Sequence, residues 1–316
     1  MCLRFVRIDQ SRYKSIRIIM THVGFIGIGL MGLPMCKRLL TAGVSLSVWN
    51  RNPTKCLPLV ELGASQASSI ADIAQQCDVI MLCVSNTQAV QEVVESLLPY
   101  LRKGQIIVDF SSISPDATNV LNKQVSSKGV SWVDCPVSGG VAGAQAGTLA
   151  MMAGGDESVV SSVEPLLLNL GQRLTYMGKS GSGQTTKICN QMIVSCNVLV
   201  IAEVMAMAKR AGVDAAKIPQ ALTGGFADSI PLQLTGSRMA VQDFDEIKWH
   251  VKTLLKDLDM AGDLGKALGS ATPMSGLGAQ LMRQHASHGF ADKDPATLVT
   301  LYEAMLNSDS TNDEQK

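Results

Sequence analysis

The chain lacks an excess of charge of either sign, because 27 Lys and Arg side chains are matched by 27 Asp and Glu side chains among 316 residues. Nucleic-acid-binding domains usually carry a basic excess or a basic stripe, so we expect no nucleic-acid partner. The four histidines and eight cysteines show no CxxC pair and no metal-ligand spacing, and we expect no metal site. Cysteines scattered through apolar segments predict buried free thiols in a reducing, cytoplasmic environment.

The chain also lacks an uninterrupted apolar run of the roughly 20 residues that a membrane span requires. Its most apolar stretch, residues 192–208, is interrupted by Asn197 and Glu203. This stretch therefore predicts a helix that is buried on most sides, and we expect no membrane partner. Residues 1–20 are rich in Arg and Lys but have no secretory apolar core. They fit a transit peptide or a disordered extension before a start at Met20, and we favour the extension.

Hydrophobic residues are plentiful, at 46% of a chain long enough for two domains. Between residues 21 and 183, short apolar segments alternate with helical ones. This alternation predicts an α/β domain with a doubly wound, mostly parallel sheet. Between residues 184 and 306 the segments have helical periodicity and are separated by Gly and Pro, which predicts an all-α domain opening with a long helix over 185–210. The polar residues 307–316 predict a disordered tail.

A glycine cluster follows the first predicted strand, in the string GFIGIGLMGLPM over residues 24–35. Its G-x-G-x-x-G spacing suits a dinucleotide site, because the three glycines allow a tight turn, a close approach of the pyrophosphate and close packing of helix on strand. The N-terminus of the following helix would present N–H groups to the phosphates. We assign cofactor binding to this loop, whose residues are Gly27, Ile28, Gly29, Leu30, Met31 and Gly32.

The end of the second predicted strand indicates which cofactor is bound. An NAD site favours Asp or Glu there, to accept hydrogen bonds from the ribose hydroxyls. This chain has Asn50 and Arg51, with Lys55 nearby. An arginine cannot accept those hydrogen bonds but can pair with a 2′-phosphate. The sequence therefore favours NADPH/NADP over NADH/NAD, although a solvated arginine in a turn would also fit.

Two further strings carry residues suited to carbonyl chemistry. DCPVSGG, residues 134–140, could offer the Ser138 hydroxyl and glycine N–H groups to a small carboxylate. GKSGSGQTTKICNQ, residues 178–191, leads into the long helix and places Lys187 and Asn190 on one face. A lysine near the positive end of a helix can have a lowered pKa and serve as a proton donor. Each string alone would equally fit an ordinary turn or a surface lysine.

These motifs, together with KDLDMA at residues 256–261, occur in the same order as in the β-hydroxyacid dehydrogenases, and the chain resembles that family from Met20 to about Leu306. The resemblance implies an N-terminal Rossmann domain joined by the long helix to an all-α domain. It also implies that Lys187 is the catalytic acid/base, assisted by Asn190, and that the protein forms homodimers or homotetramers. The implied substrate contacts are Ser138, Gly139, Gly140, Asn190 and Gln191. The implied further cofactor contacts are Val84, Ser85, Ser112 and Lys256.

The activity implied by the resemblance is NADPH-dependent reduction of a short semialdehyde acid to the hydroxy acid. The strings SSISP, GTLAMMAGG, KICNQ and ALTGGFADS resemble the branch that reduces 2-hydroxy-3-oxopropionate (tartronate semialdehyde) to glycerate. Cys135 and the region of Trp249 depart from the pattern of that branch. A 3-hydroxyisobutyrate dehydrogenase, a glyoxylate or succinic semialdehyde reductase, and a non-catalytic nucleotide-binding protein are the alternatives.

Overall fold

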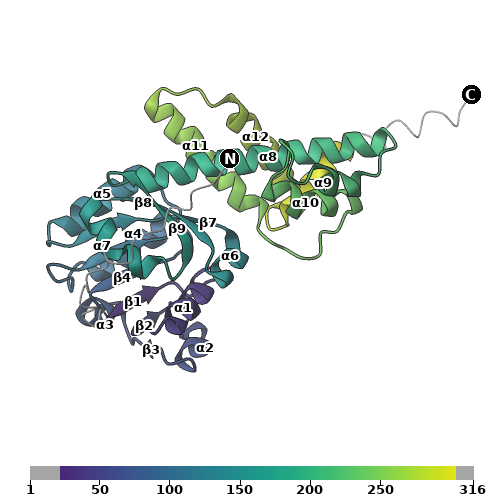
Figure 1. Cartoon of the computed structure of the whole chain (residues 1–316). Coiled ribbons are helices and arrows are strands. Elements are labelled where there is room, and N and C mark those ends of the chain that lie inside the picture. Colours follow the sequence, from purple (N-terminus) through teal and green to yellow (C-terminus); the bar gives the residue numbers. More distant parts are fainter. Residues whose placement is uncertain (1–21, 304–316) are drawn as a thin grey trace, which may run out of the picture. The chain divides into compact units, whose positions relative to one another are not determined.

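The computed structural model describes residues 22–303. The predicted extension at 1–20 and the predicted tail at 307–316 lie outside the described residues. The described chain divides into two compact units between Thr185 and Thr186 (Figure 1).

The first unit is built on one nine-stranded sheet of the described residues. Its strands are β1 (Val23–Ile26), β2 (Leu46–Trp49), β3 (Ser65–Gln66), β4 (Val79–Leu82), β5 (Ile106–Asp109), β6 (Ser131–Asp134), β7 (Val137–Ser138), β8 (Leu149–Gly154) and β9 (Gly171–Gly178). The order β3-β2-β1-β4-β5-β6 is parallel throughout. β8 runs antiparallel to β6 and β7 and parallel to β9. The predicted doubly wound, mostly parallel sheet is confirmed.

Helices cover both faces of this sheet, and alternate strand residues supply the two cores. Phe25 of β1 packs in the core that includes Met35 and Leu39, whereas Ile26 packs in the opposite core with Val90 and Leu97. The helices are α1 (Gly32–Thr41), η2 (Pro53–Cys56), α2 (Leu57–Val60), α3 (Ile70–Gln76), α4 (Thr87–Leu97), α5 (Pro115–Ser126), α6 (Gly140–Ala146) and α7 (Glu157–Leu167). Side-chain caps start several of them, at Ser69, Asn86, Ser114 and Asp156.

The described residues of the second unit form helices joined by loops and contain no strand, which confirms the predicted all-α domain. α8 (Ser182–Arg210) starts in the first unit, three residues earlier than predicted. The other helices are η3 (Ala215–Lys217), α9 (Ile218–Leu222), α10 (Ile230–Val241), α11 (Val251–Leu268), α12 (Pro273–His285), η4 (Ala286–Phe290), η5 (Pro295–Val299) and α13 (Thr300–Glu303). Within this unit α8 packs Val198, Ala202 and Met205 into the core, with no exposed surface on any of the three.

α8 is the one described helix whose length and composition would also allow a membrane span. A core helix meets the same criterion, and Val198, Ala202 and Met205 of α8 lie in the core of the second unit. Exposed apolar residues nevertheless recur along α8 at intervals of seven, at Ile193, Val200 and Met207. This spacing places them on one side of the helix.

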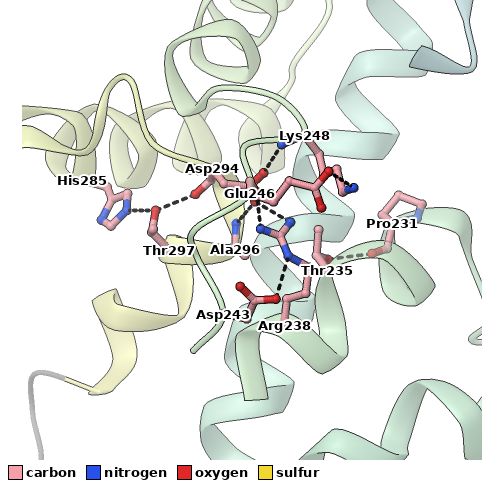
Figure 2. Close-up of polar contacts among 10 residues, drawn as sticks. All are labelled: Pro231, Thr235, Arg238, Asp243, Glu246, Lys248, His285, Asp294, Ala296 and Thr297. Atoms are coloured by element: carbon pink, nitrogen blue, oxygen red, sulfur yellow. Dashed lines mark hydrogen bonds and ion pairs between the residues drawn. The ribbon is translucent and has the colours of Figure 1, made fainter. Parts of the chain in front are cut away.

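A buried ion pair fixes the segment between α10 and α11, which contains Trp249 (Figure 2). Arg238 Nη1 lies 3.2 Å from Asp294 Oδ1, and the Asp294 side chain is fully buried. Arg238 also donates to the Glu246 carbonyl oxygen at 2.5 Å, while the N–H of Lys248 donates to Asp294 Oδ2 at 2.7 Å. The 242–250 segment and the chain before η5 are therefore attached to α10 through one arginine and one aspartate.

Most of the described cysteines fit the prediction of buried free thiols, including Cys36, Cys77 and Cys135. Cys189 does not, because it lies on an exposed position of α8. No group of three or more His, Cys, Asp or Glu side chains among residues 22–303 could hold a metal ion.

Candidate active site

The glycine loop connects β1 to α1, and each of its three glycines meets a different requirement. Gly27 has a φ of +105°, and a Cβ there would lie 2.2 Å from the carbonyl oxygen of Cys83. A Cβ at Gly32 would lie 2.0 Å from the Gly27 carbonyl oxygen. At Gly29 no atom lies within 4 Å of the corresponding position, and α1 has no side-chain cap. The first and third glycines thus allow tight packing, and the second leaves open the approach to the helix N-terminus that a pyrophosphate needs.

The turn after β2 holds the glycine loop and presents two cations. Asn50 Oδ1 accepts a hydrogen bond from the Ile28 N–H at 3.0 Å, and Asn50 Nδ2 donates to the Asn52 carbonyl oxygen. The Asn50 side chain is therefore occupied in bracing the loop. Arg51 and Lys55 are exposed and make no ion pair with any residue between 22 and 303. Both cations are free to meet a phosphate group beside the loop.

The predicted nicotinamide-side residues follow the carboxyl ends of neighbouring strands. Val84 and Ser85 come after β4, and Ser112 comes after β5, which pairs with β4 in parallel register. Ligands of open α/β sheets bind at this edge. Ser111 was not predicted from the sequence, yet its buried hydroxyl accepts a hydrogen bond from the Val84 N–H at 3.0 Å and joins the two strand ends.

The predicted carboxylate-binding residues lie where β7 passes into α6. Ser138 ends β7 and is half-buried, while Gly139 and Gly140 are exposed. Their φ values of +133° and +61° belong to a region that side chains other than glycine rarely adopt. The two glycines therefore expose backbone next to a hydroxyl group.

The second unit carries a network of polar side chains between α8 and α11. Lys187 Nζ donates to Gln191 Oε1 at 3.1 Å, and Asn190 Nδ2 donates to the same oxygen at 2.8 Å. Gln191 Nε2 donates to Asp257 Oδ2 at 2.5 Å, and Lys256 Nζ lies 3.3 Å from Asp257 Oδ1. Gln191 is thus the direct partner of the lysine, and Asn190 reaches the lysine only through Gln191.

Burial lowers the affinity of Lys187 for its proton. Burial lowers the pKa of Lys187 to about 8; the Asp257 carboxylate opposes this shift and the Lys256 ammonium adds to it. A lysine with this pKa exchanges its proton readily near neutral pH, as a general acid or base requires.

Asp257 belongs to this network, although the sequence analysis gave it no role. It is only 4% exposed and occupies the buried stripe of α11 with Leu254, Leu258 and Ala261. A carboxylate at an apolar position of an amphipathic helix was the available signal, because such a charge needs a partner when buried. Only Lys256 of the KDLDMA string had been assigned a role.

Comparison with known proteins identifies the family. The profile described as the NAD binding domain of 6-phosphogluconate dehydrogenase matches residues 22–178, and that described as NAD-binding of NADP-dependent 3-hydroxyisobutyrate dehydrogenase matches residues 181–302. The 2-hydroxy-3-oxopropionate reductase of Escherichia coli (strain K12) is 38% identical over 288 residues, which cover 90% of this chain and 98% of that protein. The chain belongs to the β-hydroxyacid dehydrogenase family. It is an NAD(P)-dependent oxidoreductase that acts on CH–OH groups.

Solved structures agree with this assignment. The 3-hydroxyisobutyrate dehydrogenase of Mycobacterium tuberculosis, determined with L-serine, is similar with a TM-score of 0.82 and 28% identity, covering 90% of this chain and 99% of that chain. A structure of Psf3 in complex with NADP+ and 2-OPP is similar with a TM-score of 0.80 and 28% identity, covering 88% and 99%. The β-hydroxyacid dehydrogenase fold thus extends over both units of the chain.

Proposed function

We propose that this β-hydroxyacid dehydrogenase reduces a short semialdehyde acid to the hydroxy acid with NADPH, and that its substrate is 2-hydroxy-3-oxopropionate, which yields glycerate. The observation that carries the proposal is the half-buried Lys187, whose ammonium donates to Gln191 Oε1 at 3.1 Å and whose pKa is lowered to about 8 by burial. The similarity to the Escherichia coli reductase supports this choice of substrate.

In this proposal, different residues donate the proton, orient the reacting groups and bind the substrate carboxylate. Lys187 gives its proton to the carbonyl oxygen as the alcohol forms, while the bound reduced nicotinamide supplies the hydride. Gln191 and Asn190 orient the lysine and the substrate oxygen. Ser138 and the N–H groups of Gly139 and Gly140 hold the substrate carboxylate.

We infer that the dinucleotide is NADPH in preference to NADH. Arg51 and Lys55 are exposed beside the glycine loop and carry positive charge where NAD-specific sites have an acidic residue. The resemblance of the chain to the NADP-dependent family profile and to the Psf3 complex with NADP+ supports this preference. Val84, Ser85, Ser112 and Lys256 are proposed to contact the nicotinamide half.

We further expect a cytoplasmic homodimer or homotetramer assembled through the second unit. The exposed stripe of Ile193, Val200 and Met207 on α8 supports this expectation. Large apolar side chains aligned on one face of a helix favour burial against another surface. Light scattering of the purified protein measures the assembly directly.

NADPH oxidation by the purified protein tests the proposed substrate. 2-Hydroxy-3-oxopropionate, methylmalonate semialdehyde, succinic semialdehyde and glyoxylate are compared by kcat/KM, and each assay is repeated with NADH. We expect the highest kcat/KM for 2-hydroxy-3-oxopropionate with NADPH. A preference for methylmalonate semialdehyde would replace the proposed substrate and favour a 3-hydroxyisobutyrate dehydrogenase. Absence of turnover with all four would contradict the proposal.

A further inference from the structure

Two aspartates that the reaction does not use lie side by side in the first unit. Asp109 ends β5, Asp134 ends β6, and the two are direct partners in the parallel register. Neither has any exposed surface. Two buried carboxylates at neighbouring strand ends are costly unless each is hydrogen-bonded or neutralised, so their partners indicate what they do.

The Asp134 carboxylate receives the backbone donors at the start of α8. Its Oδ1 accepts from the Gly181 N–H at 2.8 Å and its Oδ2 accepts from the Gln184 N–H at 3.0 Å. Gly181 immediately precedes α8, and Gln184 lies in its first turn, whose N–H groups lack partners within the helix itself. Asp134 thus acts as an N-cap supplied from a distant strand. The partial positive charge of the helix end favours its anionic form.

Asp109 has a different environment. Its Oδ1 accepts from the Ser111 N–H at 2.9 Å, and its Oδ2 has no hydrogen-bond partner among residues 22–303. Burial raises the pKa of Asp109 to about 7 and that of Asp134 to about 6, with the Asp134 charge raising the pKa of Asp109 further. Asp134 therefore keeps the negative charge, and Asp109 is the member of the pair that takes up a proton first.

Gln184 adds a second attachment at the same place. Its Nε2 donates to the Ser111 carbonyl oxygen at 2.7 Å, and its Oε1 accepts from the Ile113 N–H at 3.2 Å. Gln184 is fully buried. The first turn of α8 is consequently bonded to the chain following β5 through a side chain and to the end of β6 through its backbone. The packing at this turn is close, because a Cβ at Gly183 would lie 2.4 Å from the Met152 carbonyl oxygen.

We propose that Asp134 and Gln184 are positioning residues that lock the first turn of α8 to the ends of β6 and β5 and thereby set the placement of Lys187. α8 continues without interruption from Gln184 to Lys187, one turn later. A first turn that frays or shifts displaces the lysine on the next turn, and misplacement of a reacting group by about 1 Å can lower a rate about 100-fold. The kinetic part of this proposal rests on the proposed role of Lys187.

The test compares two isosteric substitutions in the paired aspartates. Asp134→Asn puts an NH₂ group against one of two N–H donors, so we expect kcat to fall roughly 10- to 100-fold. Asp109→Asn is the matched control. The asparagine keeps an oxygen that accepts from the Ser111 N–H, and it replaces a carboxyl group that readily takes up a proton. We therefore expect kcat to stay within about threefold of wild type. NADPH affinity, measured by fluorescence titration, should stay within about threefold in both, because neither side chain lies in the glycine loop.

A second readout does not depend on turnover. Hydrogen exchange of the amides at 183–187 should accelerate in Asp134→Asn and stay near wild type in Asp109→Asn. Equal kcat and equal exchange in the two variants would overturn the positioning role. If Asp134→Asn does not bind NADPH, the Gln184→Met variant is measured instead. A loss in kcat of at least about tenfold together with faster amide exchange at 183–187 would support the positioning role. Unchanged kcat and unchanged exchange would overturn it. If the wild-type protein turns over no semialdehyde while exchange is faster in Asp134→Asn, the proposed function is refuted. The attachment of the first turn of α8 by Asp134 is then still supported.

Discussion

Gln191 Nε2 lies 2.5 Å from Asp257 Oδ2, and this contact fixes which way the glutamine amide faces. A carboxylate only accepts hydrogen bonds and an ammonium group only donates them. The NH₂ group of Gln191 must therefore face Asp257, which leaves Oε1 facing Lys187 Nζ. A buried residue of α11 in this way orients the group that holds the lysine of α8.

Replacement of Lys187 by alanine should abolish most of the activity. Positioned proton transfer contributes about 10²- to 10⁴-fold to a rate, so we expect kcat to fall within that range while the Kd for NADPH stays unchanged. Lys209→Ala is the matched control, because Lys209 lies near the end of the same helix and pairs with Glu303. Turnover of the Lys187→Ala variant near the wild-type rate would remove Lys187 from the mechanism.

The pH profile of reduction should report the charges around Lys187. The protonated lysine is the active form, so kcat for reduction should decline as pH rises through about 8. Asp257→Asn removes a negative charge that raises the pKa of Lys187, and the midpoint should therefore move to lower pH. Lys256→Met removes a positive charge that lowers this pKa, and the midpoint should move to higher pH. Stopped-flow rates at saturating NADPH measure both shifts, and midpoints that move in the same direction would contradict the assignment.

Reversal of the charge at Arg51 should change cofactor preference. An ionic hydrogen bond contributes about 1.5–3 kcal/mol, equivalent to roughly 10- to 100-fold in binding. We expect Arg51→Glu to raise the KM for NADPH by that factor and to leave the KM for NADH nearly constant. Lys128→Glu serves as the control. This exposed lysine precedes β6 and therefore lies at the amino ends of the parallel strands, whereas Arg51 follows the carboxyl end of β2. An unaltered NADPH to NADH ratio in Arg51→Glu would refute the 2′-phosphate role.

The ion pair of Arg238 and Asp294 should dominate the stability of the second unit. Removal of one partner of a buried pair costs about 3–5 kcal/mol, because the other charge is left buried without compensation. Asp294→Ala should therefore lower the Tm markedly. Asp243→Ala provides the comparison, since the Asp243 side chain is 53% exposed and 4.0 Å from the same arginine, and it should change Tm little. Equal Tm values for the two variants in thermal denaturation would contradict the dominant role of Asp294.

Local sequence patterns determined the architecture of this protein. Apolar strands between helical segments predicted the parallel sheet, because such a sheet needs strands buried on both faces and crossover helices between them. The G-x-G-x-x-G spacing predicted the glycine loop because its packing requirements, at Gly27 and Gly32, are met within a few residues. The helical spacing placed Asn190 and Gln191 about one turn beyond Lys187, but the sequence paired the lysine with Asn190, whereas its direct partner is Gln191.

Contacts between residues far apart in the chain were decided only by the tertiary structure. Asp257 is 66 residues from Gln191, and no pattern near either residue states that α11 packs against α8 with these side chains facing. Asp134 is likewise 47 residues from Gly181, whose N–H it accepts. The sequence by itself determined which elements form and which loop has the glycine spacing of a dinucleotide site, because propensity, periodicity and turn chemistry act over short separations. The partners of the buried carboxylates followed only from folding, because burial brings distant polar groups together and each must then be satisfied.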